Sequence, residues 1–208
     1  MPSFEHPRTP WPEHVHFVGA LGPGPGAAAP VPERLRRHRR SNQLALISQG
    51  TRRDDPRELV DPAVDVLLAE GFDVLVAGVA PGRVQHPRIH PMARVDYHDA
   101  MAEADLFVTN GGYTGVTLAL ATGTPVVQCG ATEEKADIGR RLVATGAGES
   151  LPLVRPPRWL LRRAVRRCLS DPQRRQARLR IAEEFSAYPT DRLLAGHLLA
   201  LLEGNSDD

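Results

Sequence analysis

Residues 105–151 read DLFVTNGGYTGVTLALATGTPVVQCGATEEKADIGRRLVATGAGESL, and this stretch decides the fold. It opens on the short apolar run 106–109, which is typical of a strand that is buried on both faces. A glycine-rich turn and a helical pattern over 112–122 follow, and a second apolar run at 125–129 precedes a helical pattern over 133–145. Strands and helices in direct alternation predict parallel strands that are joined by helices.

The same alternation extends toward the N-terminus of this stretch. Apolar runs at 44–48 (LALIS) and 73–77 (DVLVA) predict two further strands, and helical spacing over 56–70 predicts the helix between them. A short strand at 94–95 would complete this side of the sheet. Together these elements predict an α/β fold with a Rossmann-like, doubly wound parallel sheet.

The two ends of the chain differ in pattern from the middle. Near the N-terminus, prolines and the stretch GPGPGAAAPVP predict an extended segment, with a strand-like run at 16–21 and one short charged helix within 34–40. Toward the C-terminus, 157–203 predicts two or three amphipathic helices. The chain therefore divides into three parts, which are a lead-in and linker (1–42), the sheet domain (43–188), and a C-terminal helix and tail (189–208).

The composition argues against several classes of protein. A net charge of +1 gives no global attraction to nucleic acid, and we interpret the arginine clusters as solvated helix faces because aromatic residues are not interleaved with them. No apolar run approaches the roughly 20 residues that cross a bilayer, and the first residues lack the pattern of a signal peptide. Cys129 and Cys168 form neither a disulfide framework nor a metal cluster. We therefore expect a cytoplasmic protein without a metal.

Ligands of doubly wound sheets lie beyond the carboxyl ends of the strands, so the turns that follow strands are the candidate sites. Neither a P-loop nor a G-x-G-x-x-G motif follows the first strand. The turn Ser48-Gln49-Gly50-Thr51 offers a glycine that lets a ligand approach the backbone and a hydroxyl that can donate to a phosphate. A plain strand-to-helix turn explains the same residues equally well.

Two later turns carry stronger patterns. In Asn110–Gly115, paired glycines at a helix start expose N–H groups at the positive end of the helix dipole, which suits a diphosphate. Tight packing is the alternative reason for those glycines. In the turn at 130–135, Glu134 and Lys135 either hydrogen-bond sugar hydroxyls or serve only as charges at a helix N-terminus.

Residues 105–150 resemble the donor-binding signature of UDP/TDP-sugar glycosyltransferases, especially macrolide and other antibiotic glycosyltransferases. The Gly-rich turn, A-L-A-x-G-x-P, the next strand and the acidic residue beside lysine keep the spacing of that family. VHFVGAL (15–21) resembles its interdomain strand, and LISQGT (46–51) resembles the first strand and phosphate turn of its C-terminal domain. The resemblance implies the C-terminal, nucleotide-sugar-binding half of a GT-B fold and hexosyltransferase activity toward a natural-product hydroxyl.

The resemblance also implies roles for single residues. The implied donor-phosphate contacts are Gly50, Thr51, Asn110, Gly111, Gly112, Thr114 and Gly115, the implied sugar contacts are Glu134 and Lys135, and Val95 and His98 lie in the nucleobase region. Asn110 replaces a histidine of many relatives, which exchanges a possible cation for a neutral donor. Leu118 replaces a ribose-binding glutamate, and the base-stacking Trp-x-Pro-Gln element has no clear copy.

The partner implied by the resemblance is a nucleotide-sugar, used as a substrate and without a separate cofactor. Inverting members of the family take their general base from a histidine of the N-terminal acceptor domain, which we expect this chain to lack. An acceptor-domain polypeptide or a homo-oligomer would then complete the enzyme. Two alternatives remain, a non-catalytic auxiliary or remnant half-domain that acts as a protein partner, and a nucleotide-sugar epimerase with the same fold.

Overall fold

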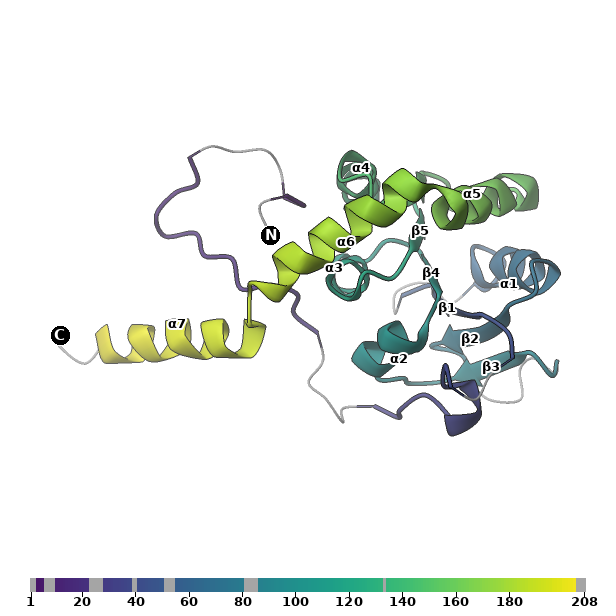
Figure 1. The fold of residues 1–208 in the computed structure, drawn as a ribbon, viewed down its shortest axis with the longest axis horizontal. Helices are drawn as coiled ribbons and strands as arrows, with labels where there is room; N and C mark the ends of the chain where they lie inside the picture. Colours follow the sequence, from purple (N-terminus) through teal and green to yellow (C-terminus); the bar gives the residue numbers. More distant parts are fainter. Residues whose placement is uncertain are drawn as a thin grey trace.

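Six strands form one sheet in the computed structural model of the protein, which describes residues 3–5, 10–22, 28–38, 41–50, 55–80, 86–132 and 134–204 (Figure 1). The strands are β1 (Leu44–Ser48), β2 (Asp73–Ala77), β3 (Ile89–Met92), β4 (Leu106–Thr109), β5 (Val126–Cys129) and β6 (Gly148–Leu151). Their order is β3-β2-β1-β4-β5-β6, and every neighbouring pair is parallel. The predicted α/β fold with a doubly wound parallel sheet is confirmed.

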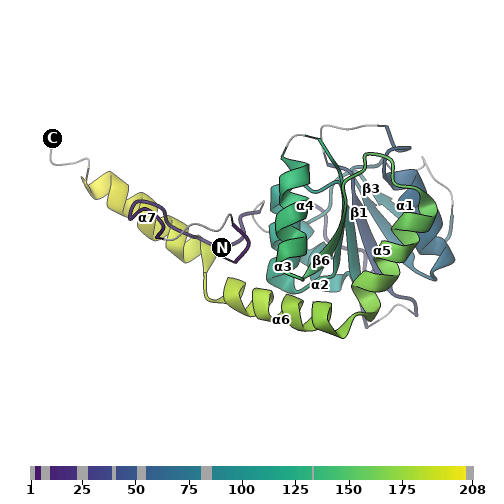
Figure 2. The ribbon, with the colours of Figure 1, turned by 90° about the horizontal axis from the view of Figure 1, so that it is seen from above.

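Helices cover both faces of this sheet. They are α1 (Val60–Ala69), α2 (Tyr97–Glu103), α3 (Tyr113–Thr122), α4 (Lys135–Ala144), α5 (Arg158–Ser170), α6 (Pro172–Ser186) and α7 (Thr190–Gly204), with a 3-10 turn η1 at Glu33–Leu35. Buried side chains of α1 and α5 pack on one face, and those of α2, α3, α4 and α6 pack on the other (Figure 2). The helix predicted over 56–70 begins only at Val60.

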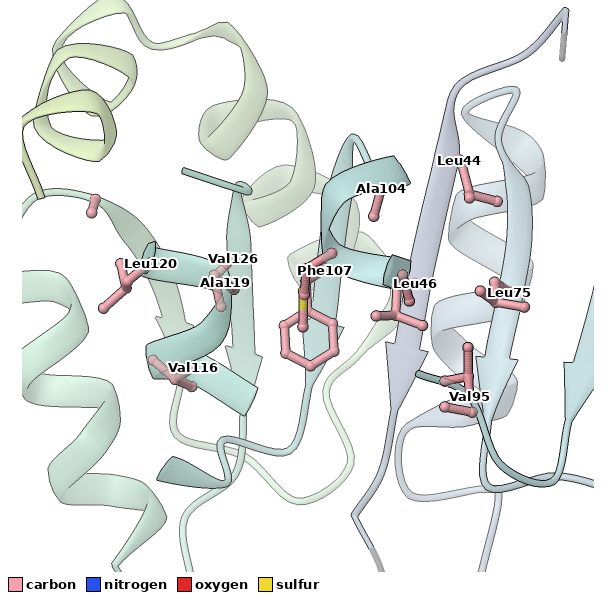
Figure 3. Packing of buried hydrophobic residues seen from close by; sticks show 14 of the residues in the cluster. Leu44, Leu46, Leu75, Val95, Ala104, Phe107, Val116, Ala119, Leu120 and Val126 are labelled. Atoms are coloured by element: carbon pink, nitrogen blue, oxygen red, sulfur yellow. The ribbon is translucent and has the colours of Figure 1, made fainter. Parts of the chain in front are cut away.

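The central strands are buried because their apolar runs are covered from both sides. Phe107 of β4 lies in register with Leu46 of β1 and Val126 of β5, in the cluster drawn in Figure 3. A Cβ added to Gly115 would stand 3.3 Å from the Phe107 ring, so the first turn of α3 packs directly over β4. The core thereby fixes where α3 begins, at the carboxyl end of its strand.

One edge of the sheet differs from the sequence prediction. The strand predicted at 94–95 is wrong, and the edge strand is β3 instead. His90 and Pro91 hide the apolar pattern of this strand. A proline is tolerated there because an edge strand leaves N–H positions unpaired. Helix α2, which follows β3, was also missed.

The opposite edge strand, β6, is absent from the prediction because Glu149 and Ser150 interrupt its apolar pattern. The carboxylate of Glu149 is buried but paired with Arg174, at 2.6 Å, and with Arg167, at 3.3 Å. Ion pairs formed only in the folded chain therefore permit a strand that local sequence does not reveal.

The lead-in is attached to the sheet domain rather than free of it. The strand predicted at 16–21 is wrong, because the structure assigns no strand there, and of the helix predicted within 34–40 it shows only η1, with residues 39 and 40 outside the described part. The Asp99 carboxylate of α2 accepts hydrogen bonds from the backbone N–H of Val31, at 2.7 Å, and from the Arg36 guanidinium, at 2.8 Å. The predicted boundaries between the three parts stay predictions.

Helix α7 projects away from the sheet in both views (Figures 1 and 2). Its exposed leucines are Leu198, Leu199, Leu201 and Leu202. Within the described ranges, no helix is both long enough and apolar enough to cross a membrane.

Candidate functional site

The strand order places a topological switch point between β1 and β4. The chain adds strands outward from β1 to β3 and then returns to add β4 on the other side. Helix α1 follows β1 on one face and α3 follows β4 on the other, so the loops that leave these two strands diverge. Such a switch point is where doubly wound sheets bind ligands. We call the carboxyl ends of β1, β4 and β5 the carboxyl edge.

The β4–α3 turn presents backbone donors at this edge. Gly111 has a φ of 92°, and its N–H donates to the Thr109 hydroxyl at 3.2 Å. Gly112 is the N-cap of α3, and its carbonyl accepts the Val116 N–H at 3.1 Å. A glycine supplies no capping side chain, and N–H groups of a first helical turn have no intrahelical acceptor. The turn thus has the groups that bind an anion.

The other two predicted residues of this turn differ in exposure. Thr114 is exposed, whereas Gly115 is partly buried against Phe107. The structure therefore leaves the Thr114 side chain open to solvent and gives Gly115 a packing role as well as a backbone N–H.

Asn110 connects the β4–α3 turn to the β1–α1 turn. Its side-chain amide donates to the carbonyl of Gln49, and its backbone N–H donates to the carbonyl of Ser48 at 3.2 Å. An amide has two N–H groups, so at most one remains for a ligand. A Cβ added to Gly50 would stand 2.8 Å from the Asn110 amide nitrogen, and Gly50 has a φ of 79°. The glycine is therefore required by the approach of these two turns.

Sequence reasoning missed the role of Gln49 in the same turn. Its side-chain amide donates to the carbonyl of Asp55 at 2.6 Å, and its side-chain oxygen accepts the N–H groups of Leu59 and Val60 at 3.1 and 3.2 Å. Gln49 thus caps the N-terminus of α1 through a residue ten positions further along the chain, and the spacing of residues in the sequence does not predict this contact. The predicted phosphate contact Thr51 lies outside the described residues.

The β5–α4 turn brings a cation to the same edge. Lys135 is only 6% exposed and lines a small pocket together with Gln49, Asn110 and Gly130. Glu134, the N-cap of α4, is exposed. Lys135 and Asn110 therefore line one pocket, whereas Glu134 is not among its lining residues.

The two predicted nucleobase residues separate in the structure. Val95 is buried in the apolar cluster on the α2 side of the sheet, and Figure 3 shows it beside Leu75. His98 is exposed on α2. A Cβ added to Gly22 would stand 3.0 Å from both the His98 ring and the buried Leu118 side chain, so these residues gather where the lead-in passes α2 and α3.

Tyr97, the first residue of α2, contacts the last residue of β1 and was not identified as a site residue from the sequence. The Tyr97 hydroxyl and the Ser48 hydroxyl are 2.6 Å apart. Burial raises the pKa of Tyr97, and the bond to Ser48 opposes that rise only in part. The phenol therefore stays protonated at neutral pH and can donate a hydrogen bond.

The lead-in also touches the first residue of α3. Glu5 accepts a hydrogen bond from the Tyr113 hydroxyl and pairs with Arg141 of α4 at 2.6 Å. Phe4 is 1% exposed, and the Arg141 guanidinium lies 5.1 Å from its ring centroid. Burial, and next the contact with Glu5, raise the pKa of Tyr113. Residues 3–5 are thus part of the wall around the β4–α3 turn.

The thiol of Cys129 lines the pocket at the carboxyl edge and is buried. Burial raises the pKa of the Cys129 thiol to about 12, so it is not a thiolate nucleophile at neutral pH. Among the described residues no group of three or more histidine, cysteine, aspartate or glutamate side chains could hold a metal ion. The backbone N–H groups of the β4–α3 turn favour an anionic ligand, and the pocket beside this turn is lined by both Lys135 and Glu58.

Asp55 makes this edge sensitive to acid. Its carboxylate accepts hydrogen bonds from Arg57 at 2.9 Å and from Arg155 at 3.0 Å. The bond from Arg57 is the main cause that lowers the pKa of Asp55 from 3.8 to about 2. A pKa lowered in the folded state stabilises the fold above pH 3.8, and that stabilisation is lost as the pH falls toward 2.

We expect Asp55→Asn to lower the urea midpoint near neutral pH, with the difference from wild type disappearing at about pH 2. A difference that grows on acidification would contradict this assignment.

Comparison with known proteins identifies relatives of this chain, although no family model matches it. The 4'-demethylrebeccamycin synthase of Lentzea aerocolonigenes is 36% identical over 192 residues, which cover 90% of this chain and 45% of that protein. The UDP-glucosyltransferase avaP of Aspergillus versicolor is 29% identical over 196 residues, which cover 90% of this chain and 43% of that protein. The chain thus spans about half the length of the curated relatives it matches.

Solved structures show the same relation at the level of the fold. The calicheamicin glycosyltransferase CalG4 matches with a TM-score of 0.74 and 21% identity, over 99% of this chain and 52% of that one. The spinosyn rhamnosyltransferase SpnG, complexed with thymidine diphosphate, matches with a TM-score of 0.76 and 20% identity, over 95% of this chain and 54% of that one.

Proposed function

We propose that this chain, which is homologous to one half of the GT-B glycosyltransferases, binds a nucleotide-sugar donor at its carboxyl edge. The observation that carries the proposal is the β4–α3 turn, where an uncapped helix N-terminus stands at the switch point of the sheet. A diphosphate is the part of the donor that this turn would hold, because several N–H groups and the helix dipole favour negative charge there.

The remaining parts of the donor are assigned by position relative to that turn. The sugar would contact Glu134 and Lys135, since Lys135 lines the pocket beside Asn110. The nucleobase would lie toward α2, where His98 is exposed, while Val95 supports that side from the core. The SpnG complex with thymidine diphosphate supports a TDP-sugar, and the similarity to the UDP-glucosyltransferase avaP supports a UDP-sugar.

Transfer of the sugar requires more than this half of the fold. We propose that a second, acceptor-binding half, on the same or another polypeptide, supplies the general base for a natural-product hydroxyl. The relatives are about twice as long as the matched region, which supports such a half. The exposed leucines of α7 offer it an apolar contact surface.

Isothermal titration of the purified chain with UDP, TDP and their glucose conjugates tests the proposal. We expect saturable binding without transfer of the sugar. Gly112→Ala should weaken binding at least about 10-fold, or about 1.4 kcal/mol, because the added methyl group would stand between the diphosphate and the N–H groups.

The matched control is Gly196→Ala in α7. A Cβ added to Gly112 or to Gly196 meets no atom within 4 Å, so both changes leave the packing intact. Only the first should alter the titration. Unchanged binding by Gly112→Ala would remove the diphosphate from this turn, and failure of the wild-type chain to bind any of the four ligands would favour a non-catalytic half-domain.

A further inference from the structure

The side chain of Gln128 connects the two turns to which the donor is assigned. This residue lies in β5 and is fully buried, with 0% of its surface exposed. Its strand neighbours in register are Thr109 of β4 and Ser150 of β6. A buried amide at this position has to be satisfied by the protein itself, because solvent does not reach it.

The hydrogen bonds of Gln128 fix the orientation of its amide. The side-chain nitrogen donates to the carbonyl of Gly130 at 3.1 Å, to that of Lys135 at 3.3 Å and to that of Asn110 at 3.4 Å. The side-chain oxygen accepts a hydrogen bond from the Ser150 hydroxyl at 2.5 Å. Backbone carbonyls only accept, so the reversed amide would face three acceptors with its oxygen. The network therefore allows one orientation.

Three glycines from three segments leave the space that this amide occupies. A Cβ added to Gly111 would stand 2.6 Å from Cγ of Gln128, and one added to Gly139 of α4 would stand 2.5 Å from its side-chain oxygen. One added to Gly130 would first meet the Asn110 carbonyl oxygen, which accepts a hydrogen bond from Gln128, and would stand 3.3 Å from the Gln128 side-chain nitrogen. The β4–α3 turn, the β5–α4 turn and α4 thus all pack closely around Gln128 and its hydrogen-bond partners.

The three carbonyls belong to both parts of the donor site. Asn110 begins the β4–α3 turn, which would hold the diphosphate, whereas Gly130 and Lys135 belong to the turn and helix that would hold the sugar. Because two N–H groups serve three carbonyls, at least one bond is shared, and movement of either turn disturbs the bonds of the other.

We propose that Gln128 is a positioning residue that holds the diphosphate turn and the sugar turn at the separation a nucleotide-sugar requires. The inference rests on the proposed function for its ligand, but the link between the two turns belongs to the free protein. Gln128 itself is buried behind the site and would not touch the donor.

Gln128→Met tests the link, because methionine has similar length and makes none of the four hydrogen bonds. Hydrogen–deuterium exchange is measured without ligand on peptides that cover 110–116, 130–138 and α1. We expect amide exchange in the first two regions to accelerate at least about 10-fold together, with α1 unchanged. Acceleration in only one turn, in neither, or throughout the domain would overturn the inference.

The matched control is Thr124→Val, two residues before the start of the same strand. Its hydroxyl is buried and donates to the carbonyl of Met101 at 3.0 Å, so this change also removes a buried hydrogen bond. We expect exchange in both turns to stay at the wild-type rate. Accelerated exchange in both turns of this variant would show that any loss of stability loosens them, and would overturn the inference.

Titration then separates positioning from a general loss of stability. Gln128→Met should weaken binding of UDP-glucose at least about 10-fold but binding of UDP by no more than about 3-fold, since only the conjugate spans both turns. Equal losses would overturn the positioning role. Wild-type protein that binds neither ligand would refute the proposed function, while the exchange measurement would still decide whether Gln128 joins the turns.

Discussion

Gly112→Asp is expected to make the protein slightly more stable and its affinity for a nucleoside diphosphate at least about 100-fold weaker, or about 2.8 kcal/mol. Aspartate is a favourable N-cap residue that exceeds glycine by a few tenths of a kcal/mol. The backbone of Gly112, with φ −61° and ψ 136°, suits such a cap, and the space beside its Cα is open. The same carboxylate would repel a diphosphate, because like charges about 4 Å apart interact by about 4 kcal/mol near a protein surface.

Urea denaturation and isothermal titration on the same preparation measure the two effects. Their opposite signs matter, because a variant that merely misfolds loses both stability and affinity. Gly112→Asn is the matched control: it caps the helix similarly without adding a charge, so it should bind more tightly than Gly112→Asp. A stabilised Gly112→Asp protein with wild-type affinity would show that the β4–α3 turn is a packing device.

Substitution of the neighbouring glycine, Gly111, is expected to lower the stability of the protein. Gly111→Ala should destabilise the protein by roughly 2–5 kcal/mol, from about 1–2 kcal/mol for a side chain in the left-handed region and about 1–3 kcal/mol for overpacking. Gly111 has a φ of 92°, and an added Cβ would stand 2.6 Å from Cγ of Gln128. Such a loss is a large part of the roughly 5–15 kcal/mol that stabilises a typical domain.

The urea midpoint and slope of Gly111→Ala, compared with Gly112→Ala, measure this effect. Gly112→Ala should lie within about 1 kcal/mol of wild type, since its Cβ meets nothing within 4 Å and only the N-cap preference for glycine over alanine opposes the change. A double variant with Gln128→Ala should recover the part that is due to crowding but not the part that is due to φ. Equal stability of the two alanine variants would contradict the described packing of the turn.

The fold was predictable where local pattern and burial agree. The runs LALIS, DVLVA, LFVT and PVVQC are apolar because β1, β2, β4 and β5 are covered on both faces, and these strands were predicted. The edge strands were displaced or missed, since β3 contains a proline and β6 contains a glutamate that is neutralised by distant arginines. The residues that pack against these edge strands or neutralise their charges are distant along the chain, so the local spacing of apolar residues does not reveal them.

The candidate site, like the fold, was predictable from local sequence features but not from contacts between distant residues. Glycines at the ends of strands identified the β4–α3 turn, because a helix start after a buried strand is a local feature. The contacts that hold the turns together were not predictable, since Asn110 reaches Gln49 across 61 positions and Gln128 reaches Ser150 across 22. Gln128 inside an apolar strand is a local signal from which such a network could have been predicted, because a buried amide requires partners.

The most direct test of donor binding at the carboxyl edge is a titration of the ¹⁵N-labelled chain with UDP and TDP, followed by the backbone amide resonances. We expect the amides of Tyr113, Thr114 and Gly115 to shift together and saturably, with that of Lys135 responding further when the glucose conjugate is used. Saturable shifts confined to another part of the chain, such as α1 and β3, would contradict the account.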